Sequence, residues 1–374
     1  MEKELFSSLI HKYIHLISLY LNKKSGDDFT IDEKEYSFFL KVSKKHSLTA
    51  FFYKALFDTK VNVSKEQLKG LEEYYFANIR KDVMFEKERN ELFSYLNDNQ
   101  IDFLPLKGLI LKHFYLDPYT REFADNDILF GSHDELIKKY FVNKGYEVEV
   151  YRKTNHDVYL KKPFYNFEMH RALFSEREDI PKFAKYFDNY LKEASIKQGY
   201  EHELNKEQFY IYFTAHTFKH FQHSGCGIRT LIDYYLYLKN NELDFNYINE
   251  ELKKLDLLDF SNMFSVLVNK LFNEEPLTNE EEETLLYIAS SGTYGTLEHS
   301  VSVGVNKKGK FRYFMSRIFP PLSFYKTYYK WAYYSIILIP VAWLIRFFRI
   351  LFKNPKRATK ELSLISKSKE KKKK

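Results

Sequence analysis

The sequence lacks the features that mark an exported or disulfide-bonded protein. Its single cysteine, Cys226, excludes an intramolecular disulfide and fits a reducing cytoplasm. The N-terminus, Met-Glu-Lys-Glu-Leu-Phe, carries acidic residues and no long apolar core, so we expect no signal peptide and a cytoplasmic location. No internal repeat at the periods of solenoid proteins is found. With 374 residues, 44% hydrophobic and 18% aromatic, the chain has material for two or three globular domains.

Acidic residues are scarce near the C-terminus. Residues 301–374 hold 19 of the 58 Lys and Arg residues but 2 of the 51 Asp and Glu residues, which gives a net charge of +17. The other 39 basic and 49 acidic residues give residues 1–300 a net charge of −10. An acidic body with a basic end is not the pattern of a protein that wraps nucleic acid, so we expect no sequence-specific nucleic-acid partner. We expect instead that the basic end meets something anionic.

The basic end also lacks a charge-free run of the length that spans a bilayer. Residues 311–352 contain 15 aromatic residues among Lys and Arg, and Trp331–Ile345 is 15 residues without a charge, whereas about 20 are needed. One interpretation is a pair of helices packed on the core. Another is an interfacial segment that places residues 311–374 on an anionic membrane surface; a true span is the least favoured. The tail, 367–374, is expected to be disordered and to strengthen any such contact.

The spacing of apolar residues predicts an α+β fold, in which a small mixed β-sheet core is flanked by N-terminal and C-terminal helical domains. In the N-terminal part we expect helices at about 5–20, 33–58 and 64–96, the last opened by a capping box at Ser64 and Gln67. The predicted boundaries are an N-terminal helical region at 1–96, the α+β core at 97–178, a helical domain at 179–300, a basic aromatic segment at 301–366 and the tail at 367–374.

The α+β core is predicted from alternating strand-like and helix-like segments between Ile101 and His170. The expected strands are 101–106, 125–130, 146–151, 157–161 and 165–170, and the expected helices are 109–116 and 132–142. After Pro181 the pattern is helical again, with candidates at 181–195, 205–222, 228–240, 246–272 and 279–290.

Two aspartates open the strand predicted at 125–130. Side chains two residues apart leave a strand by the same face, so the carboxylates of Asp125 and Asp127 point to one place. Like charges this close raise each other's pKa unless a cation lies between them. A divalent metal is the usual cation, and Mg²⁺, or Mn²⁺, fits carboxylates and substrate phosphates. The pattern therefore favours phosphoryl-type chemistry, although a solvated Asp-x-Asp turn is the common alternative.

A third carboxylate is expected in the strand 165–170. Glu168 shares a strand face with Asn166 and His170, and a charge in a half-buried strand is costly unless it is paired or bound. If this strand neighbours the strand 125–130, Glu168 completes a three-carboxylate metal site with Asp125 and Asp127. Such a site can hold two metal ions about 3.5–4 Å apart.

A turn at Lys107 and Gly108 is expected to bind the phosphate groups beside the metal site. Lys107 and Gly108 lead from a strand into a predicted helix, where phosphate can approach backbone N–H groups near the positive end of the helix dipole. Lys107 adds a charge, and Arg121 suits bidentate contact with phosphate.

In this segment the chain resembles the polymerase-β-type nucleotidyltransferase superfamily. More closely, Leu104–Phe130 resembles the bacterial family described only as uncharacterised nucleotidyltransferases. In that family a strand ending in Leu-Lys-Gly leads to a helix, then to an Arg ahead of Asp-Ile-Asp-Leu-Leu. The matching residues here are Lys107, Gly108, Arg121, Asp125 and Asp127. The family's third acid, in an apolar-Asp-apolar-His strand, corresponds to Glu168, followed by His170.

The resemblance continues into the helical half and covers roughly residues 70–350. His216, Lys219 and His220 resemble the family's His-x-x-Lys-His helix, while Arg229 and Asp233 resemble its Arg-x-x-x-Asp helix. The resemblance implies that Arg229 faces the nucleotide and that His170, His216, His220 and Asp233 support the site. A simple i,i+4 ion pair between Arg229 and Asp233 is the alternative.

Two departures and one competing metal site accompany the resemblance. Asn126 stands where the family has an apolar residue, and Glu168 is longer than Asp by one methylene. Separately, His216, His220 and His223 fall on one helical face near Cys226, a donor set that zinc accepts. Surrounding aromatic residues and the family pattern favour a structural or substrate-facing role for these histidines.

The expected function is metal-dependent nucleotidyl transfer. The resemblance implies that a nucleoside monophosphate passes from a nucleoside triphosphate to a hydroxyl acceptor on a small molecule, a glycan or a protein. The alternative is a catalytically idle module that keeps the fold and docks a membrane or a protein partner. A template-directed polymerase is disfavoured by the acidic body.

Overall fold

The computed structural model describes most of the chain. The described residues are 3–175, 180–223, 225–292, 301, 304–305, 309–320, 325, 332, 336–353 and 355–367. The chain forms two compact units, one made of residues 1–218 and 227–293 and the other of residues 219–226 and 294–374. The predicted disordered tail lies outside the described residues beyond Lys367, as do many of the aromatic residues between Pro321 and Ser335.

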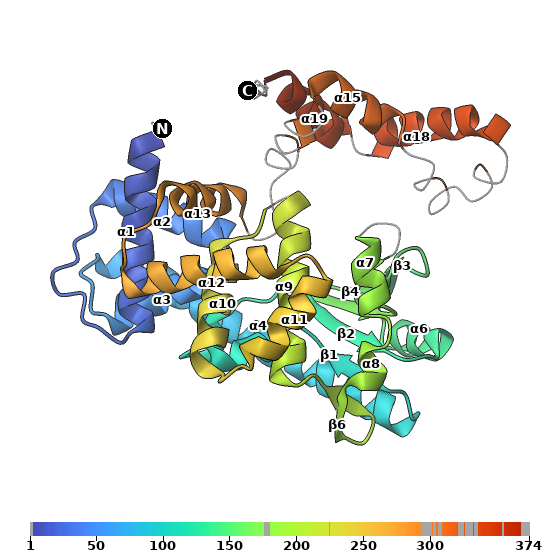
Figure 1. Ribbon diagram of the computed structural model, residues 1–374, viewed down its shortest axis with the longest axis horizontal. Coiled ribbons are helices and arrows are strands. Elements are labelled where there is room, and N and C mark those ends of the chain that lie inside the picture. Colours follow the sequence, from blue (N-terminus) through green and yellow to red (C-terminus); the bar gives the residue numbers. More distant parts are fainter. Residues whose placement is uncertain are drawn as a thin grey trace. The chain divides into compact units, whose positions relative to one another are not determined.

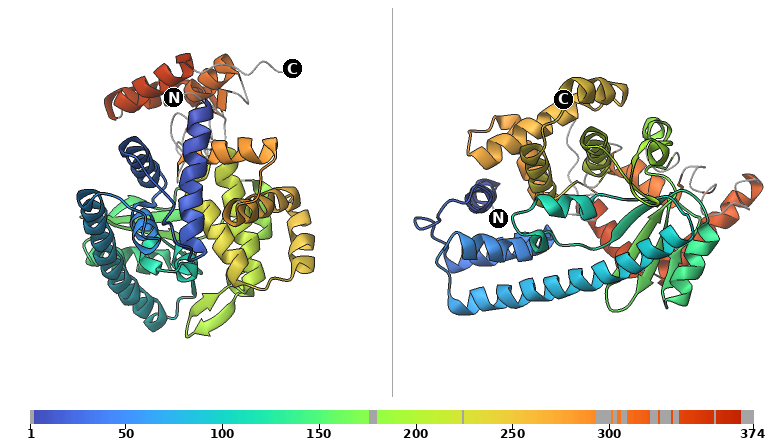
Figure 2. Two further views of the ribbon diagram at one scale, coloured as in Figure 1. Left: turned by 90° about the vertical axis from the view of Figure 1, so that its left-hand side faces the viewer. Right: turned by 90° about the horizontal axis from the view of Figure 1, so that it is seen from below.

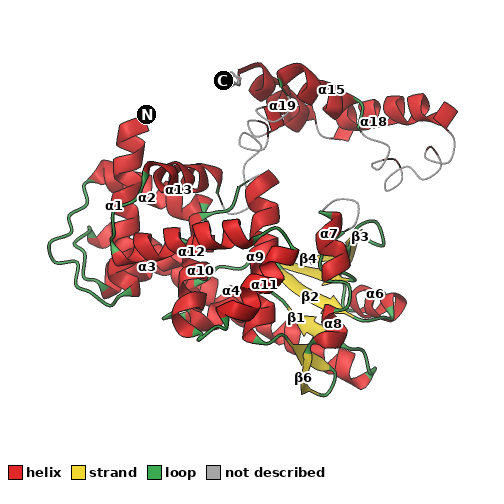
Figure 3. Cartoon of the chain, in the orientation of Figure 1, coloured by secondary structure: helices red, strands yellow, loops and turns green. Residues whose placement is uncertain are grey.

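The α+β fold class is confirmed: helices make up most of the described chain and surround a seven-stranded mixed sheet (Figure 3). The sheet order is β3-β4-β5-β2-β1-β7-β6. The strands are β1 (Phe103–Pro105), β2 (Asn126–Phe130), β3 (Glu147–Val150), β4 (His156–Lys161), β5 (Tyr165–His170), β6 (Ser195–Gln198) and β7 (Glu201–Glu203).

The helices of the first unit fall before, within and after the sheet (Figure 1). They are α1 (Lys3–Leu21), α2 (Glu33–Lys45), α3 (Thr49–Asp58), α4 (Lys65–Asp98), α5 (Gly108–Leu111), α6 (Asp134–Asn143), α7 (Pro181–Tyr186), α8 (Tyr190–Glu193), α9 (Lys206–His223), α10 (Ile228–Asn240), α11 (Phe245–Lys254), α12 (Leu258–Asn273) and α13 (Asn279–Ser291), with short 3-10 turns η1 (Lys112–Phe114) and η2 (Pro118–Thr120). Helix α9 ends in the second unit.

The two faces of the sheet carry different side chains at its centre, where β2 lies between β5 and β1. β2 runs parallel to β5 and antiparallel to β1. Because side chains alternate along a strand, Asn126, Ile128 and Phe130 leave β2 by one face, while Asp127 and Leu129 leave by the other. All five residues of β2 are buried, so the two faces differ in the kind of side chain they carry and not in burial.

Helices α4 and α6 cover the face that carries Ile128 and Phe130 (Figure 2). Apolar side chains of both helices join this core, among them Phe85 and Leu92 of α4 and Phe141 of α6. The 34-residue helix α4 begins with the predicted capping box, in which Ser64 and Gln67 hydrogen-bond to each other's backbone N–H. Since apolar side chains fill this face of the sheet, the candidate site lies on the opposite face, which carries Asp127.

Two predicted helices are each broken by a turn. The helix predicted at 33–58 divides into α2 and α3, and Ser47 between them has a φ of +52°. The helix predicted at 246–272 divides into α11 and α12, and Asp256 between them has a φ of +56°. Neither break contains glycine or proline, so the sequence showed no signal that would end the predicted helix at either position.

The hairpin β6–β7 was not predicted from the sequence. Residues 181–195 were expected to be one helix, but α7 and α8 are short and β6 begins at Ser195. Every residue of β6 is exposed, so the segment shows none of the apolar alternation that indicates a strand. Gly199, with a φ of +60°, allows the turn, and β7 attaches the hairpin to β1.

The second unit contains short helices with a small apolar core. Its described helices are α15 (Lys310–Ile318), α18 (Ile339–Lys353) and α19 (Pro355–Lys367), with the 3-10 turn η3 (Ile336–Leu338). Ile339 and Ala342 of α18 pack with Tyr325 and Ala332. Among the described residues, no helix combines the length and apolarity needed to cross a bilayer.

His46 ties three helices of the first unit together. It follows α2, is fully buried, and accepts a hydrogen bond at Nδ1 from the N–H of Ile228 at the start of α10 (3.1 Å). Its Nε2 donates to the carbonyl of Ala289 in α13 (3.0 Å). Burial lowers the pKa of His46 to about 3, more than the hydrogen bond to Ala289 raises it. The folded protein therefore holds a neutral imidazole.

We predict that His46 makes the free energy of unfolding fall in acid. Its folded pKa lies below the unfolded value of about 6.5, so the unfolded state binds the proton first. The stabilisation is present above pH 6.5 and is lost as the pH falls toward 3. Urea unfolding between pH 6 and 4 should show a slope about 1.4 kcal/mol per pH unit steeper than in His46→Gln. Equal slopes in the two proteins would contradict this role.

Candidate functional site

Asp127 and Glu168 lie directly opposite each other on the face of the sheet that α4 and α6 do not cover. In the parallel pair of β2 and β5, Asp127 is in register with Glu168, and Leu129 with His170. The condition stated for the sequence, that these two strands are neighbours, is met. The Asp127 side chain is 8% exposed and the Glu168 side chain 23%, so the first is buried and the second is open to solvent.

Asp127 is held by two nitrogen donors. Lys107 Nζ lies 2.9 Å from Asp127 Oδ1, and His170 Nε2 lies 2.7 Å from the same oxygen. Burial by itself would raise the Asp127 pKa, but Lys107 and the hydrogen bond from His170 outweigh it and hold that pKa well below its usual range. The pKa of Lys107 is raised in turn: burial opposes this, and the charge of Asp127 prevails. The pair is therefore ionised.

Asp125 stands just before β2 and is half-buried. Burial, followed by the charge of Asp127, raises the pKa of Asp125 to about 6, while Lys107 and Arg229 act in the opposite direction. This is the behaviour of a carboxylate beside a like charge. Carboxylate oxygens are the ligands that Mg²⁺ prefers. In the described residues, however, Asp125, Asp127 and Glu168 do not come together as a group of three donors within 4.8 Å of one another.

The helix that follows Lys107 is shorter than predicted. Helix α5 is four residues long and continues as the 3-10 turn η1, so the predicted helix 109–116 and its dipole are reduced to about one turn. Lys107 has a φ of +45°, a strained value for a residue other than glycine. A Cβ on Gly108 would lie 2.6 Å from Nη1 of Arg121 and 2.8 Å from the Phe123 ring. Glycine is therefore required by the close approach of Arg121.

Arg121 is joined to Asp233 by a buried bidentate ion pair. Its Nε and Nη2 donate to the two carboxylate oxygens of Asp233 at 2.8 and 2.9 Å. Tyr115 also donates to Asp233, at 2.7 Å. Both charged side chains are at most 6% exposed. The pair connects the loop before β2 to helix α10. The sequence analysis gave Arg121 a phosphate-binding role and Asp233 a supporting role, whereas the structure pairs the two side chains with each other.

Arg229 approaches the site from the start of α10. Its Nη1 donates to the backbone carbonyl of Glu122 (2.7 Å), and its charge opposes the rise in the pKa of Asp125. Glu122, which the sequence analysis did not single out, accepts from the N–H of Ala50 at the start of α3 (3.0 Å) and from Tyr74 of α4 (2.9 Å). The segment that leads into Asp125 is thus anchored by three helices.

Helix α9 brings further aromatic groups toward the carboxylates. Tyr212 is buried, and the charges of Lys107, Asp127 and Glu168 all act on its pKa, which burial raises. The ring of His216 lies 6.1 Å from that of Tyr212. Of the other predicted supporting residues, His220 belongs to the second unit. Cys226 belongs to that unit too; burial raises the pKa of its thiol to about 12.

His156 is a residue that the sequence analysis missed. It lies on β4 opposite His170 of β5, and its Nε2 is 3.7 Å from Oε2 of Glu168. A search of the described part of the chain for metal-binding groups gives one cluster, made of His156, Glu168 and His170. The predicted strand began at Asp157, one residue too late, whereas β4 begins at His156; strand alternation extended by that residue was the available signal.

Asn126 lies on the opposite face of the sheet from the carboxylates. Arg89 of α4 donates to its side-chain oxygen (3.0 Å), and its amide donates to the carbonyl of Asn166 (3.3 Å). The departure from the apolar family residue is therefore satisfied by a buried arginine on α4. It leaves the positions of Asp125 and Asp127 on the strand unchanged.

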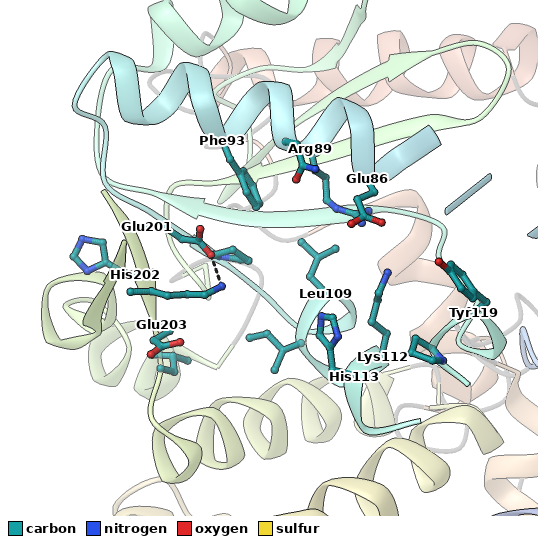
Figure 4. Close-up of a pocket in the computed structure, with 16 residues that line it drawn as sticks. Glu86, Arg89, Phe93, Leu109, Lys112, His113, Tyr119, Glu201, His202 and Glu203 are labelled. Carbon is teal, nitrogen blue, oxygen red and sulfur yellow. Dashed lines mark hydrogen bonds and ion pairs between the residues drawn. The ribbon is translucent and has the colours of Figure 1, made fainter. Parts of the chain in front are cut away.

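A pocket of about 650 Å³ is lined by residues of α4, among them Glu86, Arg89 and Phe93 (Figure 4), and its lining does not include Asp125, Asp127 or Glu168. Its cationic side chains are already paired. Lys112 contacts Asp82 at 2.8 Å, Arg89 is 3.7 Å from the same carboxylate, and Lys197 pairs with Glu201 at 2.8 Å. We therefore assign the pocket no part in the chemistry.

A family model described as "Uncharacterised nucleotidyltransferase" matches residues 32–273, which is more than half of the chain. A search of curated proteins and a search of solved structures each found no match.

We predict that Asp233→Asn destabilises the first unit by about 3–5 kcal/mol, because it leaves the guanidinium of Arg121 buried without a compensating charge. Urea unfolding followed by circular dichroism would measure the loss. The exposed Asp259→Asn is the matched control and should change stability by less than about 0.5 kcal/mol. Similar stabilities for the two variants would show that the ion pair does not join the loop to α10.

Proposed function

Because the chain belongs to the family of uncharacterised nucleotidyltransferases, we propose that it is a metal-dependent nucleotidyltransferase of the polymerase-β type. It moves a nucleoside monophosphate from a nucleoside triphosphate to a hydroxyl group of a small molecule, a glycan or a protein. The observation that carries this proposal is the register of β2 and β5, which sets Asp127 beside Glu168 with Lys107 2.9 Å away.

The carboxylates provide the cation site. Asp125, Asp127 and Glu168 would hold Mg²⁺ or Mn²⁺, which when bound screens the phosphate charge and polarises the reacting oxygens. Lys107 neutralises Asp127 before substrate arrives. Once that carboxylate has a cation, the ammonium group of Lys107 can turn to a phosphate oxygen, because its side chain is flexible and 19% exposed.

Arg229 and Lys107 are the phosphate-binding cations in this proposal. Arg229 is half-buried at the start of α10 and acts electrostatically on Asp125. Arg121 has a positioning role, because its guanidinium is held by Asp233 and lies against Gly108. His170 orients Asp127 through its hydrogen bond, at 2.7 Å.

The reaction follows from these positions. The acceptor oxygen attacks the α-phosphorus, the bond from that phosphorus to the bridging oxygen breaks, and pyrophosphate leaves with the electron pair. In this proposal Glu168, whose side chain is more exposed than that of Asp127, takes the acceptor's proton. Positioning and electrostatic stabilisation supply most of the rate enhancement in such transfers.

We predict that Asp127→Asn lowers transfer by about 100-fold or more, because a neutral amide cannot hold the cation at the reacting phosphate. The protein, Mg²⁺ or Mn²⁺, radiolabelled nucleoside triphosphates and a cell extract would be incubated together, and both pyrophosphate and labelled product would be measured. Asp259→Asn, on the surface of α12, should retain full activity, and circular dichroism would verify the fold of both variants.

Transfer that survives in Asp127→Asn would refute the assignment of this site. If the wild-type protein binds nucleotide without releasing pyrophosphate under any of these conditions, the idle binding module is the better description.

A further inference from the structure

We propose that His156, Glu168 and His170 form a binding site for a late first-row divalent metal ion such as Zn²⁺. The three side chains come from adjacent antiparallel strands, on which His156 is paired with His170 and Val158 with Glu168. His156, Glu168 and His170 alternate with buried Asp157, Phe167 and Met169, so they share one sheet face. A continuous strand ladder holds their backbones in place.

The distances between donor atoms suit a single ion. Oε2 of Glu168 lies 3.7 Å from Nε2 of His156 and 3.7 Å from Nε2 of His170. One donor atom from each residue lies within 4.8 Å of the others. Bonds of about 2.0–2.2 Å to a tetrahedral ion place donors roughly 3.3–3.6 Å apart. Small side-chain rotations therefore suffice, with no movement of the strands.

The site is open on one side and supported on the other. The side chains of His156 and Glu168 are 28% and 23% exposed, so an ion can enter, whereas His170 is 6% exposed. Nδ1 of His156 lies 3.3 Å from Oδ1 of Asn155, a contact that orients the ring. Asp127 keeps its ion pair with Lys107 at 2.9 Å when Nε2 of His170 turns to the metal.

The donor set separates this ion from the one bound by the aspartates. Imidazole nitrogen suits Zn²⁺ and related ions, whereas Mg²⁺ takes oxygen ligands. The sheet face then offers two neighbouring cation positions, one rich in oxygen at Asp125 and Asp127 and one rich in nitrogen at His156 and His170, with Glu168 beside both. The inference depends on the geometry of the cluster and does not require nucleotidyl transfer.

Metal binding by the full chain, after treatment with EDTA, tests the site. Calorimetric titration with Zn²⁺ should give one site whose affinity falls at least about 10-fold in His156→Ala, since one of three ligands is lost. Asp125→Asn should keep Zn²⁺ binding and weaken Mg²⁺ binding, and His113→Ala, an exposed histidine on η1, should change neither. Co²⁺ in place of Zn²⁺ should give a visible absorption band that His156→Ala alters.

Equal Zn²⁺ affinity in the wild type and in His156→Ala, or no Zn²⁺ binding, would overturn the proposal. If circular dichroism shows that His156→Ala is unfolded, Glu168→Gln replaces it with the same expectation. Because binding and the Co²⁺ spectrum are the readouts, loss of transferase activity alone would count against the proposed function and not against this site.

An independent observation concerns helix α18, where we infer that an exposed apolar face rests on an anionic phospholipid membrane. Val341, Leu344, Ile345 and Phe348 recur at helical spacing and are 44–59% exposed. The opposite side of the helix is occupied, because Ile339 and Ala342 are buried in the small core of the second unit. These four side chains therefore form an exposed apolar stripe of the kind that enters a membrane interface.

The positive charge of the segment favours an anionic membrane as the binding partner of this stripe. Helix α18 has no acidic residue and ends in Arg346, Arg349 and Lys353. Residues 301–374 carry a net charge of +17, which repels another copy of the same segment and attracts anionic headgroups. At 15 residues, α18 is too short to span a bilayer. A helix lying in the interface would bury its apolar stripe, and the net positive charge of residues 301–374 would attract the segment to anionic headgroups.

Vesicle flotation of the full chain tests this surface. Binding to vesicles that contain phosphatidylglycerol should exceed binding to pure phosphatidylcholine at least about 10-fold and weaken in 0.5 M salt, because headgroup attraction is screened. Phe348→Ser should reduce flotation several-fold. Phe76→Ser on α4, which is 49% exposed against 53% for Phe348, is the matched control and should leave flotation unchanged.

No flotation with anionic vesicles, or equal flotation of the Phe348→Ser and wild-type proteins, would overturn the membrane proposal. Sedimentation analysis distinguishes the other occupant: if Phe348→Ser abolishes a dimer and leaves flotation unchanged, the stripe is a contact between two copies.

Discussion

The site depends on the parallel pairing of β2 with β5, which puts Asp127 and Glu168 at paired positions on one face of the sheet. The buried carboxylate of Asp127 is tolerated there because Lys107 and His170 donate to the same oxygen of Asp127. The compensation is incomplete, since the pKa of Asp125 is still raised to about 6 by burial and by the charge of Asp127. A buried carboxylate beside a like charge is a common feature of metal sites.

The rest of the first unit holds the segment before β2 in place. Glu122 links this segment to α3 and α4, and Arg121 links it to α10 through Asp233. Polar pairs of this kind are expensive to bury, and they constrain orientation more than they add stability. Their positions indicate that the helical regions before and after the sheet serve the site as supports. The close approach of Arg121 to Gly108 also explains why a larger residue does not fit at the start of α5.

Sequence reasoning identified the fold class and the two central strands, because strand alternation and turn signals depend on neighbouring residues. The pairing of β2 with β5 was a condition that only the structure could test. It missed the hairpin β6–β7, whose first strand is exposed at every position and shows no apolar alternation. It also missed His156, because the partner of a residue on the next strand depends on register, which the sequence leaves open by one or two residues. The breaks at Ser47 and Asp256 contain no glycine or proline and could not be recognised locally.

By itself the sequence determined which side chains share a strand face, the division into a mixed sheet and helical regions, and the concentration of positive charge at one end. These properties follow from periodicity and composition, which need no knowledge of contacts between distant residues. The tertiary structure alone decided which charges meet. Arg121 pairs with Asp233, and Lys107 pairs with Asp127, because strand register and helix packing bring together residues separated by up to 112 positions.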